Sequence, residues 1–539
     1  MKFNLKKLIW ITIGSVFVFC LTLLFYINFR HEYLSFSDAA KFADIARNLL
    51  NSNGYSSSFT FFSRNIFEKL ASEFVMSKVP PMMPVSILIS YKIFGVKDFA
   101  VLATSFFYFT LSLIFTFLLA KKIFKNNLTA CLSLIAVGFN YDLIKYGTSG
   151  ASESLFIFEI VAGLYFILLR KSWSAAVAMF LIILMYFTRA QSFIYIAGLI
   201  LFWLLITFKT KKAFIYFGLT MVLGLFVDHF IIPLLPRSFF FYSVSTGGQN
   251  FLTQYLPGSA VSNQLRGATV NAPSVDFIKK VFYNLYNFYK LMPDILNPYL
   301  FALFVIGLFK QSNERIKNSF KLVSIFMVVV TLLITAASIP FFRYIHPIIP
   351  IVYIISVGTV VEIVSYQFSK QISLVVVSTF LILLVAVGQT LGIFLLDSRF
   401  ESHTHNIGKA PVYVTLGKIL KENTKENQVV VTNLDTWGSW YGERNTIWFP
   451  LEPKQLIDES AGKIPFDAIY LTSYLMDDEN YYIGVSWRQI FDNPTDSKKW
   501  VCDGCQEINK EFKLKGIYNI PSNDSYENIT SKAILLVKR

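Results

Sequence analysis

The sequence predicts a mainly α-helical membrane protein, a bundle of about eleven transmembrane helices followed by a small C-terminal α/β domain. Hydrophobic residues make up 54% of the chain and charged residues only 15%, and the mean hydropathy is +0.51. These values exclude a soluble globular protein. Apolar runs of about 20 residues, the length that crosses a bilayer, recur along most of the chain. A polar tail follows the last run and is long enough for one domain.

The net charge of +15 comes mainly from small groups of Lys and Arg between the apolar runs. Such groups follow the positive-inside rule and do not form a nucleic-acid groove, so nucleic acid is excluded as a partner. Their alternation predicts the topology of a membrane protein, for which we expect the plasma (inner) membrane. It places the N-terminus in the cytoplasm and the C-terminal domain outside it.

The predicted spans share an apolar core with polar or basic ends, and the first has the features of a retained signal anchor. They are Leu8–Asn28, Asp98–Ala120, Leu128–Tyr146, Gly150–Leu169, Trp173–Thr188, Gln191–Phe208, Ala213–Leu235, Pro293–Phe309, Leu322–Ile339, Tyr344–Gln367 and Ile372–Leu396. The predicted domains are therefore a membrane domain at residues 1–396 and an extracytoplasmic α/β domain at residues 397–539.

The first long outer loop, residues 29–97, contains a predicted amphipathic helix that starts near Ser37. Ser37 can act as its N-cap, and Asp38 then lies in the first turn, where the helix dipole favours a carboxylate. An apolar stripe follows at helical spacing: Phe42, Ile45, Ala46 and Leu49. We expect this helix to lie at the membrane surface and to hold Asp38 between lipid and water.

Two further loop segments carry predictions. Lys78–Gly95 is too short to span and begins with prolines, so we expect a second interfacial helix there. The second outer loop, residues 236–292, is rich in Gly, Ser, Asn and Gln around Gly247–Gly267, as expected of a mobile cover over a substrate or of a plain linker. Both interpretations are open.

The C-terminal tail has the alternating pattern of an α/β domain. We predict a helix at Val412–Leu420 and strands at Gln428–Thr432, Thr446–Phe449, Ala468–Leu471 and Ala533–Val537. Cys502 and Cys505 form a lone CxxC without a second pair or a nearby His. A zinc site would lack ligands, which leaves a local disulfide or two free thiols.

Ionisable residues within the spans gather at the outer ends, where with Asp38 they could line one outward-opening cavity. They are Glu153, Arg189, Asp228, His229, Arg343 and His346. A transport pathway would instead place charges through the full thickness of the membrane. Each residue also has a structural interpretation: Asp38 and Glu153 as helix-start carboxylates, the arginines as snorkelling side chains, and His346 as a hydrogen-bonded interfacial histidine.

Five short motifs, in order along the spans, resemble the GT-C superfamily of membrane glycosyltransferases. The resemblance is closest to the bacterial branch of protein O-mannosyltransferase-like enzymes and aminoarabinose transferases. The motifs are Ser37-Asp38-Ala39-Ala40 with Gly54-Tyr55; Pro80-Pro81 with Phe94-Gly95; Thr148–Phe156; Thr188–Gln191; and Arg343–Pro350.

The resemblance implies a hexosyl- or pentosyltransferase that uses a polyprenyl-phosphate-linked sugar as donor. The acceptor would be a hydroxyl of a protein, lipid or glycan outside the cytoplasm. Asp38 matches the catalytic acid of the first loop. Glu153 matches the acidic position that opens a later span and is the second catalytic candidate. The candidates for the lipid phosphate are Arg189, Arg343 and His346. Lipids would be the other partners, and we expect no cofactor and no metal.

In the expected mechanism Asp38 is the general base and the anomeric carbon is inverted. Partial burial would raise the pKa of Asp38 and strengthen it as a base. The alternatives are a transporter or flippase of lipid-linked glycans, which should show broken helices and repeats, and a non-catalytic receptor or assembly factor. Substituting Asp38 by Asn distinguishes all three.

Overall fold

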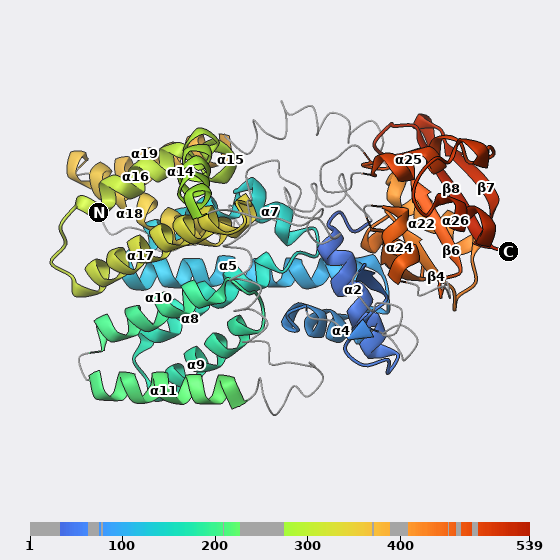
Figure 1. Ribbon diagram of the computed structural model, residues 1–539. Coiled ribbons are helices and arrows are strands. Elements are labelled where there is room, and N and C mark those ends of the chain that lie inside the picture. The colour runs from blue at the N-terminus through green and yellow to red at the C-terminus, as the bar shows by residue number, and fades with distance from the viewer. Residues whose placement is uncertain are drawn as a thin grey trace.

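The computed structural model of the chain has a helical bundle at one end and a β-sheet at the other (Figure 1). It describes residues 33–62, 75–76, 79–207, 210–226, 274–368, 371–388, 408–450, 452–459, 465–476 and 483–539. The predicted first span, the Asp228–His229 pair and the loop segment Gly247–Gly267 lie outside these residues.

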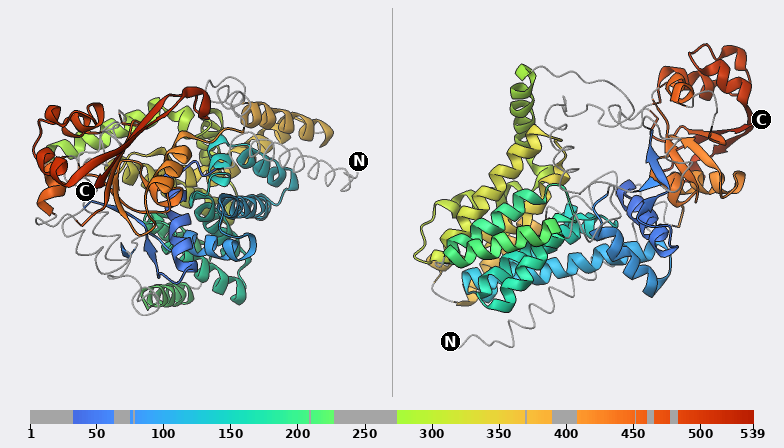
Figure 2. Two further views of the ribbon diagram at one scale, coloured as in Figure 1. Left: turned by 90° about the vertical axis from the view of Figure 1, so that its right-hand side faces the viewer. Right: turned by 60° about the horizontal axis from the view of Figure 1, so that its bottom comes forward.

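Three helical segments of the described chain are long and apolar enough to cross a membrane. They are α5 (Asp98–Phe124), α17 (Arg315–Ala337) and Phe342–Gln367, in which the 3-10 turns η2 (Phe342–Tyr344) and η3 (His346–Ile348) lead into α18 (Ile349–Gln367). Several shorter apolar helices pack with them (Figure 2). The predicted number of eleven spans therefore stays a prediction.

One predicted span, Leu128–Tyr146, is broken into α6 (Asn127–Gly138) and α7 (Tyr141–Gly147), which meet at a bend of 71°. The break follows from Asn140, whose side chain accepts a hydrogen bond from the backbone N–H of Leu143 and so starts a new helix. The prediction of one continuous span at Leu128–Tyr146 is wrong.

The remaining helices of the bundle follow the predicted apolar runs, with some shifted ends. They are α8 (Glu153–Leu169), α9 (Ser172–Tyr186), α10 (Ser192–Ile206), α11 (Thr210–Phe226), α14 (Ser274–Lys290), α15 (Met292–Ile295), α16 (Pro298–Phe309) and α19 (Gln371–Ile382), which continues as the π-helical turn η4 (Leu383–Val387). Helix α14 occupies the end of the predicted second outer loop, so that part of the loop is helical. Buried aromatic side chains such as Phe156, Tyr195 and Tyr353 fill the core between these helices.

The C-terminal unit, by which we mean the described residues from 408 to 539, is built on a six-stranded sheet with the order β2-β5-β4-β6-β8-β7. Its own strands are β4 (Val429–Thr432), β5 (Asn445–Trp448), β6 (Ala468–Thr472), β7 (Phe512–Ile520) and β8 (Ser531–Lys538). Strands β2, β5, β4 and β6 are parallel, whereas β8 is antiparallel to β6 and β7. The four predicted strands are present, and β7 adds a fifth.

Five helices complete the C-terminal unit: α22 (Val412–Asn423), α23 (Thr436–Trp440), α24 (Pro453–Glu459), α25 (Val485–Asp492) and α26 (Cys505–Glu511). Helix α22 lies where the sequence predicts it. Cys502 and Cys505 are joined as a disulfide, which decides between the two alternatives left open by the sequence.

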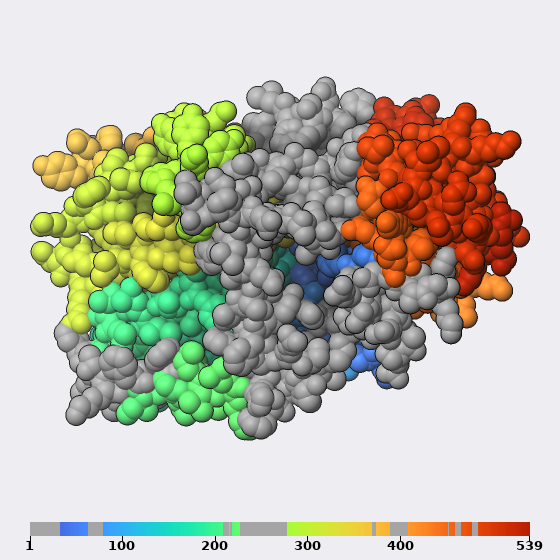
Figure 3. All heavy atoms as spheres, in the orientation of Figure 1, coloured from blue at the N-terminus to red at the C-terminus, as the bar shows by residue number. Residues whose placement is uncertain are grey.

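The sixth strand, β2 (Phe59–Phe61), belongs to the first outer loop and pairs in parallel with β5. In the same loop β1 (Ser56–Ser57) pairs with β3 (Val75–Met76). The loop is therefore part of the C-terminal sheet as well as part of the bundle, and its blue atoms lie beside the orange ones of the C-terminal unit in the space-filling view (Figure 3).

The predicted amphipathic helix is α2 (Ser37–Leu50), and the predicted second interfacial helix is α4 (Met82–Phe94). The apolar face of α2 packs on α4 and α23, whereas Asp38 and Lys41 on the same helix are partly exposed. The expected position of α2 at the membrane surface stays a prediction. Its N-cap is Phe36 without a side-chain hydrogen bond, so the prediction that Ser37 caps the helix is wrong. Ser37 is instead its first residue.

Candidate functional site

Asp38 lies in the first turn of α2, as predicted, and it forms an ion pair with Arg343 of η2. The Arg343 Nη1 atom donates to Asp38 Oδ2 at 2.6 Å. The Asp38 side chain is 44% exposed and that of Arg343 is 28% exposed, so the pair lies at a surface that a ligand can reach. A predicted catalytic residue and a predicted phosphate-binding residue are thus in direct contact.

The pKa of the Asp38 carboxyl is below its usual value. Burial raises this pKa, but the charge and hydrogen bond of Arg343, with smaller contributions from Arg189 and Lys41, together lower it by more. The expectation of a raised pKa is therefore wrong, because it took account of burial and left out the guanidinium. Asp38 is ionised at neutral pH.

Glu153, the first residue of α8, forms the second pair of the site with Arg189 from the turn between α9 and α10. Arg189 Nη1 lies 2.7 Å from Glu153 Oε1 and also donates to Ser152 Oγ at 2.9 Å. Both charged side chains are nearly buried, at 3% and 11% exposed. The preceding residue, Thr188, donates from Oγ1 to Glu159 Oε1 at 2.8 Å, which fixes the turn that carries Arg189.

Tyr344 joins the two ion pairs. The guanidinium carbons of Arg189 and Arg343 each lie 5.5 Å from the centroid of its ring, within the range of cation–π contacts. The structure therefore brings Asp38, Glu153 and both arginines together around one aromatic side chain. Sequence reasoning missed Tyr344, although its position directly after Arg343 was a usable signal.

His346 lies apart from these pairs and is buried, with 3% of its side chain exposed. Its Nδ1 atom is 2.6 Å from the hydroxyl of Tyr146, and its Nε2 atom is 3.9 Å from Asp142 Oδ2. Both partners belong to α7. His346 is thus a hydrogen-bonded histidine, with side chains of the broken helix beside its ring.

Arg343 and His346 line the same cavity, whose volume is about 680 Å³. This size is typical of small-molecule sites. Its other polar walls come from the α6–α7 break, from α7, from α15 and from α18: Asn140, Tyr141, Asp142, Lys145, Tyr146, Asp294 and Tyr353. The cavity therefore has hydrogen-bond donors and acceptors on several sides, with Arg343 linking it to Asp38.

Lys41 is a further cation of the site that sequence reasoning missed, although its i+3 spacing from Asp38 on α2 was a signal. Its Nζ atom lies over the rings of Phe59 and Phe61, at 5.7 and 5.1 Å from their centroids. Burial lowers the pKa of Lys41 by more than the neighbouring carboxylates raise it. These carboxylates are Asp38, Asp435 and Asp44.

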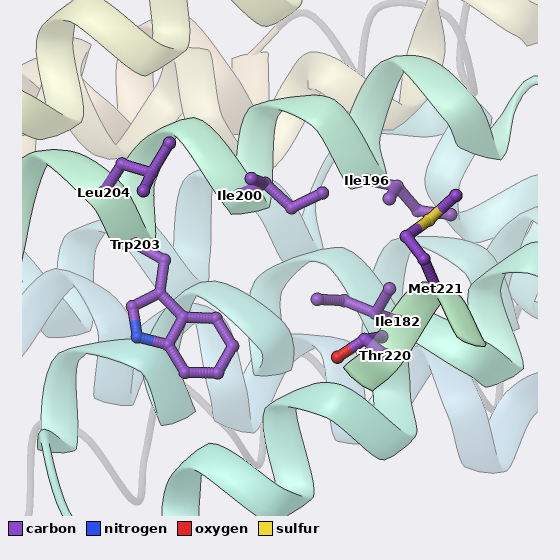
Figure 4. Close-up of a pocket in the computed structure, with 7 residues that line it drawn as sticks. All are labelled: Ile182, Ile196, Ile200, Trp203, Leu204, Thr220 and Met221. Carbon is purple, nitrogen blue, oxygen red and sulfur yellow. The ribbon is translucent and has the colours of Figure 1, made fainter. Parts of the chain in front are cut away.

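Two other cavities lie away from the ion pairs. One, of about 930 Å³, is lined by the C-terminal end of α2, the start of α5 and the C-terminal unit. The other is a small apolar gap between α9, α10 and α11, lined by side chains such as Ile182, Ile200 and Trp203 (Figure 4). Its lining has no ionisable group, so it offers no acid–base chemistry.

Within the described residues, no three His, Cys, Asp or Glu side chains come together as a group that could hold a metal ion. The prediction of metal-independent chemistry stays a prediction.

Comparison with protein-family models and with curated protein sequences gives no match. Solved structures do match over most of the chain. ArnT from Cupriavidus metallidurans bound to undecaprenyl phosphate aligns with a TM-score of 0.58 and 11% identity, over 98% of this chain and 98% of that chain. The apo oligosaccharyltransferase of Archaeoglobus fulgidus aligns with a TM-score of 0.54 and 10% identity, over 88% and 71%. This chain has the GT-C fold.

A third similar structure is the archaeal oligosaccharyltransferase AglB in complex with an inhibitory peptide and a dolichol-phosphate, with a TM-score of 0.50 and 11% identity. It covers 86% of this chain and 70% of that chain. The GT-C fold and the membrane-length helices make this chain an integral membrane protein. At these identities the likeness establishes the fold, and the activity has to be argued from the site.

Proposed function

We propose that the protein transfers a sugar from a polyprenyl-phosphate donor to an acceptor hydroxyl on the outer side of the membrane, with Asp38 as general base. The observation that carries this proposal is the contact between Asp38 and Arg343 beside a polar cavity in a GT-C fold. A base for the acceptor and a cation for the phosphate are held side by side. Two similar structures contain undecaprenyl phosphate and a dolichol-phosphate, which supports a lipid phosphate as the donor carrier.

The transfer is a single displacement. The acceptor oxygen forms a bond to the anomeric carbon while its proton passes to a carboxylate oxygen of Asp38. The bond between the anomeric carbon and the phosphate oxygen breaks, and its electron pair leaves with the polyprenyl phosphate. Because attack and departure occur on opposite faces, the anomeric carbon is inverted.

The leaving phosphate needs positive charge and hydrogen-bond donors instead of a proton. The guanidinium of Arg343 supplies both, and charge-assisted hydrogen bonds of this kind are the strong ones in proteins. One carboxylate therefore suffices, whereas most glycoside hydrolases use two. Arg189 is the second candidate for the phosphate, and Glu153 holds it in place.

The ion pair also links donor binding to the strength of the base. In the substrate-free protein Arg343 keeps Asp38 deprotonated. A phosphate that binds Arg343 competes with Asp38 for the guanidinium and adds negative charge nearby. Both effects raise the pKa of Asp38, so the carboxylate becomes a stronger base when the donor is in place.

His346 contributes to the donor site through the wall of the cavity that it shares with Arg343. Its hydrogen bond to Tyr146 fixes the orientation of the ring. The polar groups of α7, with His346, would contact the sugar or its phosphate. The chemical class of the acceptor is a hydroxyl of a protein, lipid or glycan.

A flippase of lipid-linked glycans is the second candidate, and the bend of 71° between α6 and α7 favours it. Broken helices that line a cavity are typical of transporters. The two candidates differ in the fate of the sugar, which a transferase moves to a new oxygen and a flippase leaves on its carrier.

The test uses the full chain reconstituted in liposomes with undecaprenyl-phosphate-linked hexoses and pentoses that carry radiolabelled sugars. Release of undecaprenyl phosphate and formation of a new glycoside are measured. We expect Asp38→Asn to reduce transfer at least about 1,000-fold because the general base is lost. Asp503→Asn, at a side chain that is 87% exposed, is the matched control. Full transfer by Asp38→Asn, or flipping without transfer by the wild type, would overturn the proposal.

A further inference from the structure

The segment that leads into α2 is held by hydroxyl groups of the C-terminal unit. Thr436 Oγ1 donates to the backbone carbonyl of Ser37 at 2.7 Å. Tyr413 Oη donates to the carbonyl of Leu34 at 2.8 Å, and the N–H of Leu34 donates to Tyr441 Oη at 3.0 Å. The residue directly before Asp38 and the strand-like entry to its helix are therefore fixed from across the molecule.

Helix α23, which begins at Thr436, and the residue that follows it, Tyr441, also contact the start of α5. Trp440 Nε1 donates to Asp98 Oδ1 at 2.7 Å, and Tyr441 Oη donates to Asp98 Oδ2 at 2.8 Å. Asp98 is the first residue of the long membrane helix α5. A single tyrosine hydroxyl thus connects the entry to α2 with the outer end of a transmembrane helix.

The C-terminal end of α2 is held as well. Arg47 Nη2 donates to the carbonyl of Ser439 at 2.9 Å, and its guanidinium lies 4.9 Å from the centroid of the Trp440 ring. Further along the loop, the N–H of Thr446 in β5 donates to the carbonyl of Ser58 at 2.7 Å, beside the β2–β5 pairing. Both ends of α2 are therefore attached to the C-terminal unit.

The backbone of Asp435, the residue before Thr436, is strained. Its φ of 56° and ψ of −154° belong to a region that is almost confined to glycine and that is unfavourable for an aspartate. Asp435 Oδ1 accepts a hydrogen bond from the N–H of Thr436 at 2.7 Å. The strained residue is the N-cap of α23 and thus sets the direction in which this helix starts at Thr436, and strain of this kind is found mainly at functional positions.

We propose that Thr436 is a positioning residue for Asp38, and that the C-terminal unit is the element that places this carboxylate against Arg343. Thr436 acts through the backbone of Ser37 and touches neither substrate. The catalytic part of this inference rests on the proposed function, whereas its structural part does not. Tyr413 and Tyr441 share the role, since they hold Leu34.

A purely structural contact would stabilise the fold and leave the chemistry of Asp38 unchanged. The positioning role differs because it sets the distance between Asp38 and the charges that face it. These charges are Arg343 on η2, Arg189 on the α9–α10 turn and Lys41 on α2 itself, and all of them lower the pKa of Asp38. When α2 moves away from Arg343, this pKa rises, and the acid limb of kcat/KM moves to higher pH.

The experiment compares Thr436→Val, which keeps the shape and removes the hydroxyl, with Thr436→Ser, which keeps the hydroxyl. Both are made in the full chain in nanodiscs. We expect Thr436→Val to lower kcat about tenfold, the effect of one lost hydrogen bond. The KM for the undecaprenyl-phosphate sugar should change less, and the acid limb should shift upward. Thr436→Ser should restore kcat and the position of the acid limb.

Hydrogen–deuterium exchange of the peptides that cover residues 34–41 gives a readout that needs no substrate. Exchange should be faster in Thr436→Val than in the wild type and normal in Thr436→Ser. Tyr413→Phe should have the same effect at Leu34. Tyr470→Phe is its matched control, because the Tyr470 hydroxyl donates to the carbonyl of Leu416 at 3.0 Å within the C-terminal unit.

The outcomes separate the two proposals. If Thr436→Val exchanges like the wild type and keeps the wild-type acid limb, Thr436 does not position Asp38. A loss of transfer without either change would also overturn the inference. If the wild type transfers no sugar while Thr436→Val and Tyr413→Phe exchange faster, the proposed function is wrong and the positioning of α2 stands. Should Thr436→Val fail to fold, the comparison of Tyr413→Phe with Tyr470→Phe decides.

Discussion

Arg343 donates a hydrogen bond to Asp38 at 2.6 Å, although the two residues are 305 positions apart in the chain. The contact joins α2, which carries Asp38, to the 3-10 turn η2 before α18, which carries Arg343. Each side chain neutralises the other in the substrate-free protein. In the proposed function a phosphate that binds Arg343 competes with Asp38 for the guanidinium, so the carboxylate becomes more available to the acceptor when the donor is present.

The first prediction concerns the charge on Arg343. Substituting Arg343 by Gln should lower kcat/KM about 100- to 1,000-fold, because the departing phosphate loses its main electrostatic stabilisation. Arg343→Lys should recover part of the rate, since it keeps the charge and loses the planar fork. Release of undecaprenyl phosphate from the donor measures both variants.

Arg315→Gln is the control for this series. Arg315 donates to the carbonyl of Leu205 from the exposed start of α17 and lies outside the site. Wild-type kinetics in Arg343→Gln would show that another group stabilises the leaving phosphate.

The second prediction is the pH dependence of kcat/KM. If Asp38 is the general base, activity requires its ionised form, and Arg343 holds the pKa of this group below its usual range. Activity is therefore present above the lowered pKa and is lost as the pH falls through it. We expect a profile that stays flat into the acid range, to a pH lower than an unperturbed aspartate would allow. In Arg343→Gln the pKa of Asp38 rises, so the acid limb should move to higher pH; an unchanged limb would contradict Asp38 as the titrating base.

Short sequence patterns were enough to predict those helices and strands that neighbouring residues determine. Helical spacing predicted the position of Asp38 in the first turn of α2, and proline positions predicted helix α4. Runs of β-branched residues predicted four strands of the C-terminal unit. The gathering of Glu153, Arg189 and Arg343 also followed, because charged residues at the outer ends of packed spans share one layer.

Tertiary contacts decided the features that the sequence could not predict. Asp38 could pair with any of several cations, and only packing selects Arg343. Strand β2 has three residues, Phe59–Phe61, too few for a pattern, and exists because β5 lies beside it. The break at Asn140 interrupts a continuous apolar run through one capping hydrogen bond. Packing brings Phe61 to Lys41 and Arg189 to Tyr344, and neither contact follows from spacing along the chain.

The third prediction concerns the buried pair of Glu153 and Arg189. Substituting Glu153 by Gln leaves the guanidinium of Arg189, which is 11% exposed, without its partner carboxylate. We expect a loss of about 3–5 kcal/mol in stability, as measured for other buried pairs that lose one partner. The double variant Glu153→Leu with Arg189→Leu should unfold at a higher temperature than Glu153→Gln alone.

Thermal unfolding in detergent micelles distinguishes this prediction from a purely catalytic role. If Glu153→Gln were as stable as the wild type but inactive, Glu153 would act on the substrate and would not be the support of Arg189.

The last prediction tests how closely the start of α8 approaches α2. Gly150 has a φ of +78°, and a Cβ atom added there would lie 2.7 Å from Val101 Cγ1 and 3.0 Å from Ala39 Cβ. Ala39 directly follows Asp38, so Gly150→Ala both strains the backbone and pushes α2. We expect at least about 1–3 kcal/mol of destabilisation. Transfer should fall further than the loss of folded protein explains, because Asp38 moves relative to Arg343.

Gly218→Ala is the matched control for this substitution. Gly218 lies within α11, and a Cβ atom added there meets nothing within 4 Å. Alanine at this position should be neutral or stabilise the helix by up to about 1 kcal/mol. The two variants are compared by thermal unfolding and by kcat per folded molecule. A Gly150→Ala protein with wild-type kcat per folded molecule would show that the position of α2 tolerates this displacement, and the tight placement of Asp38 would then not be needed for transfer.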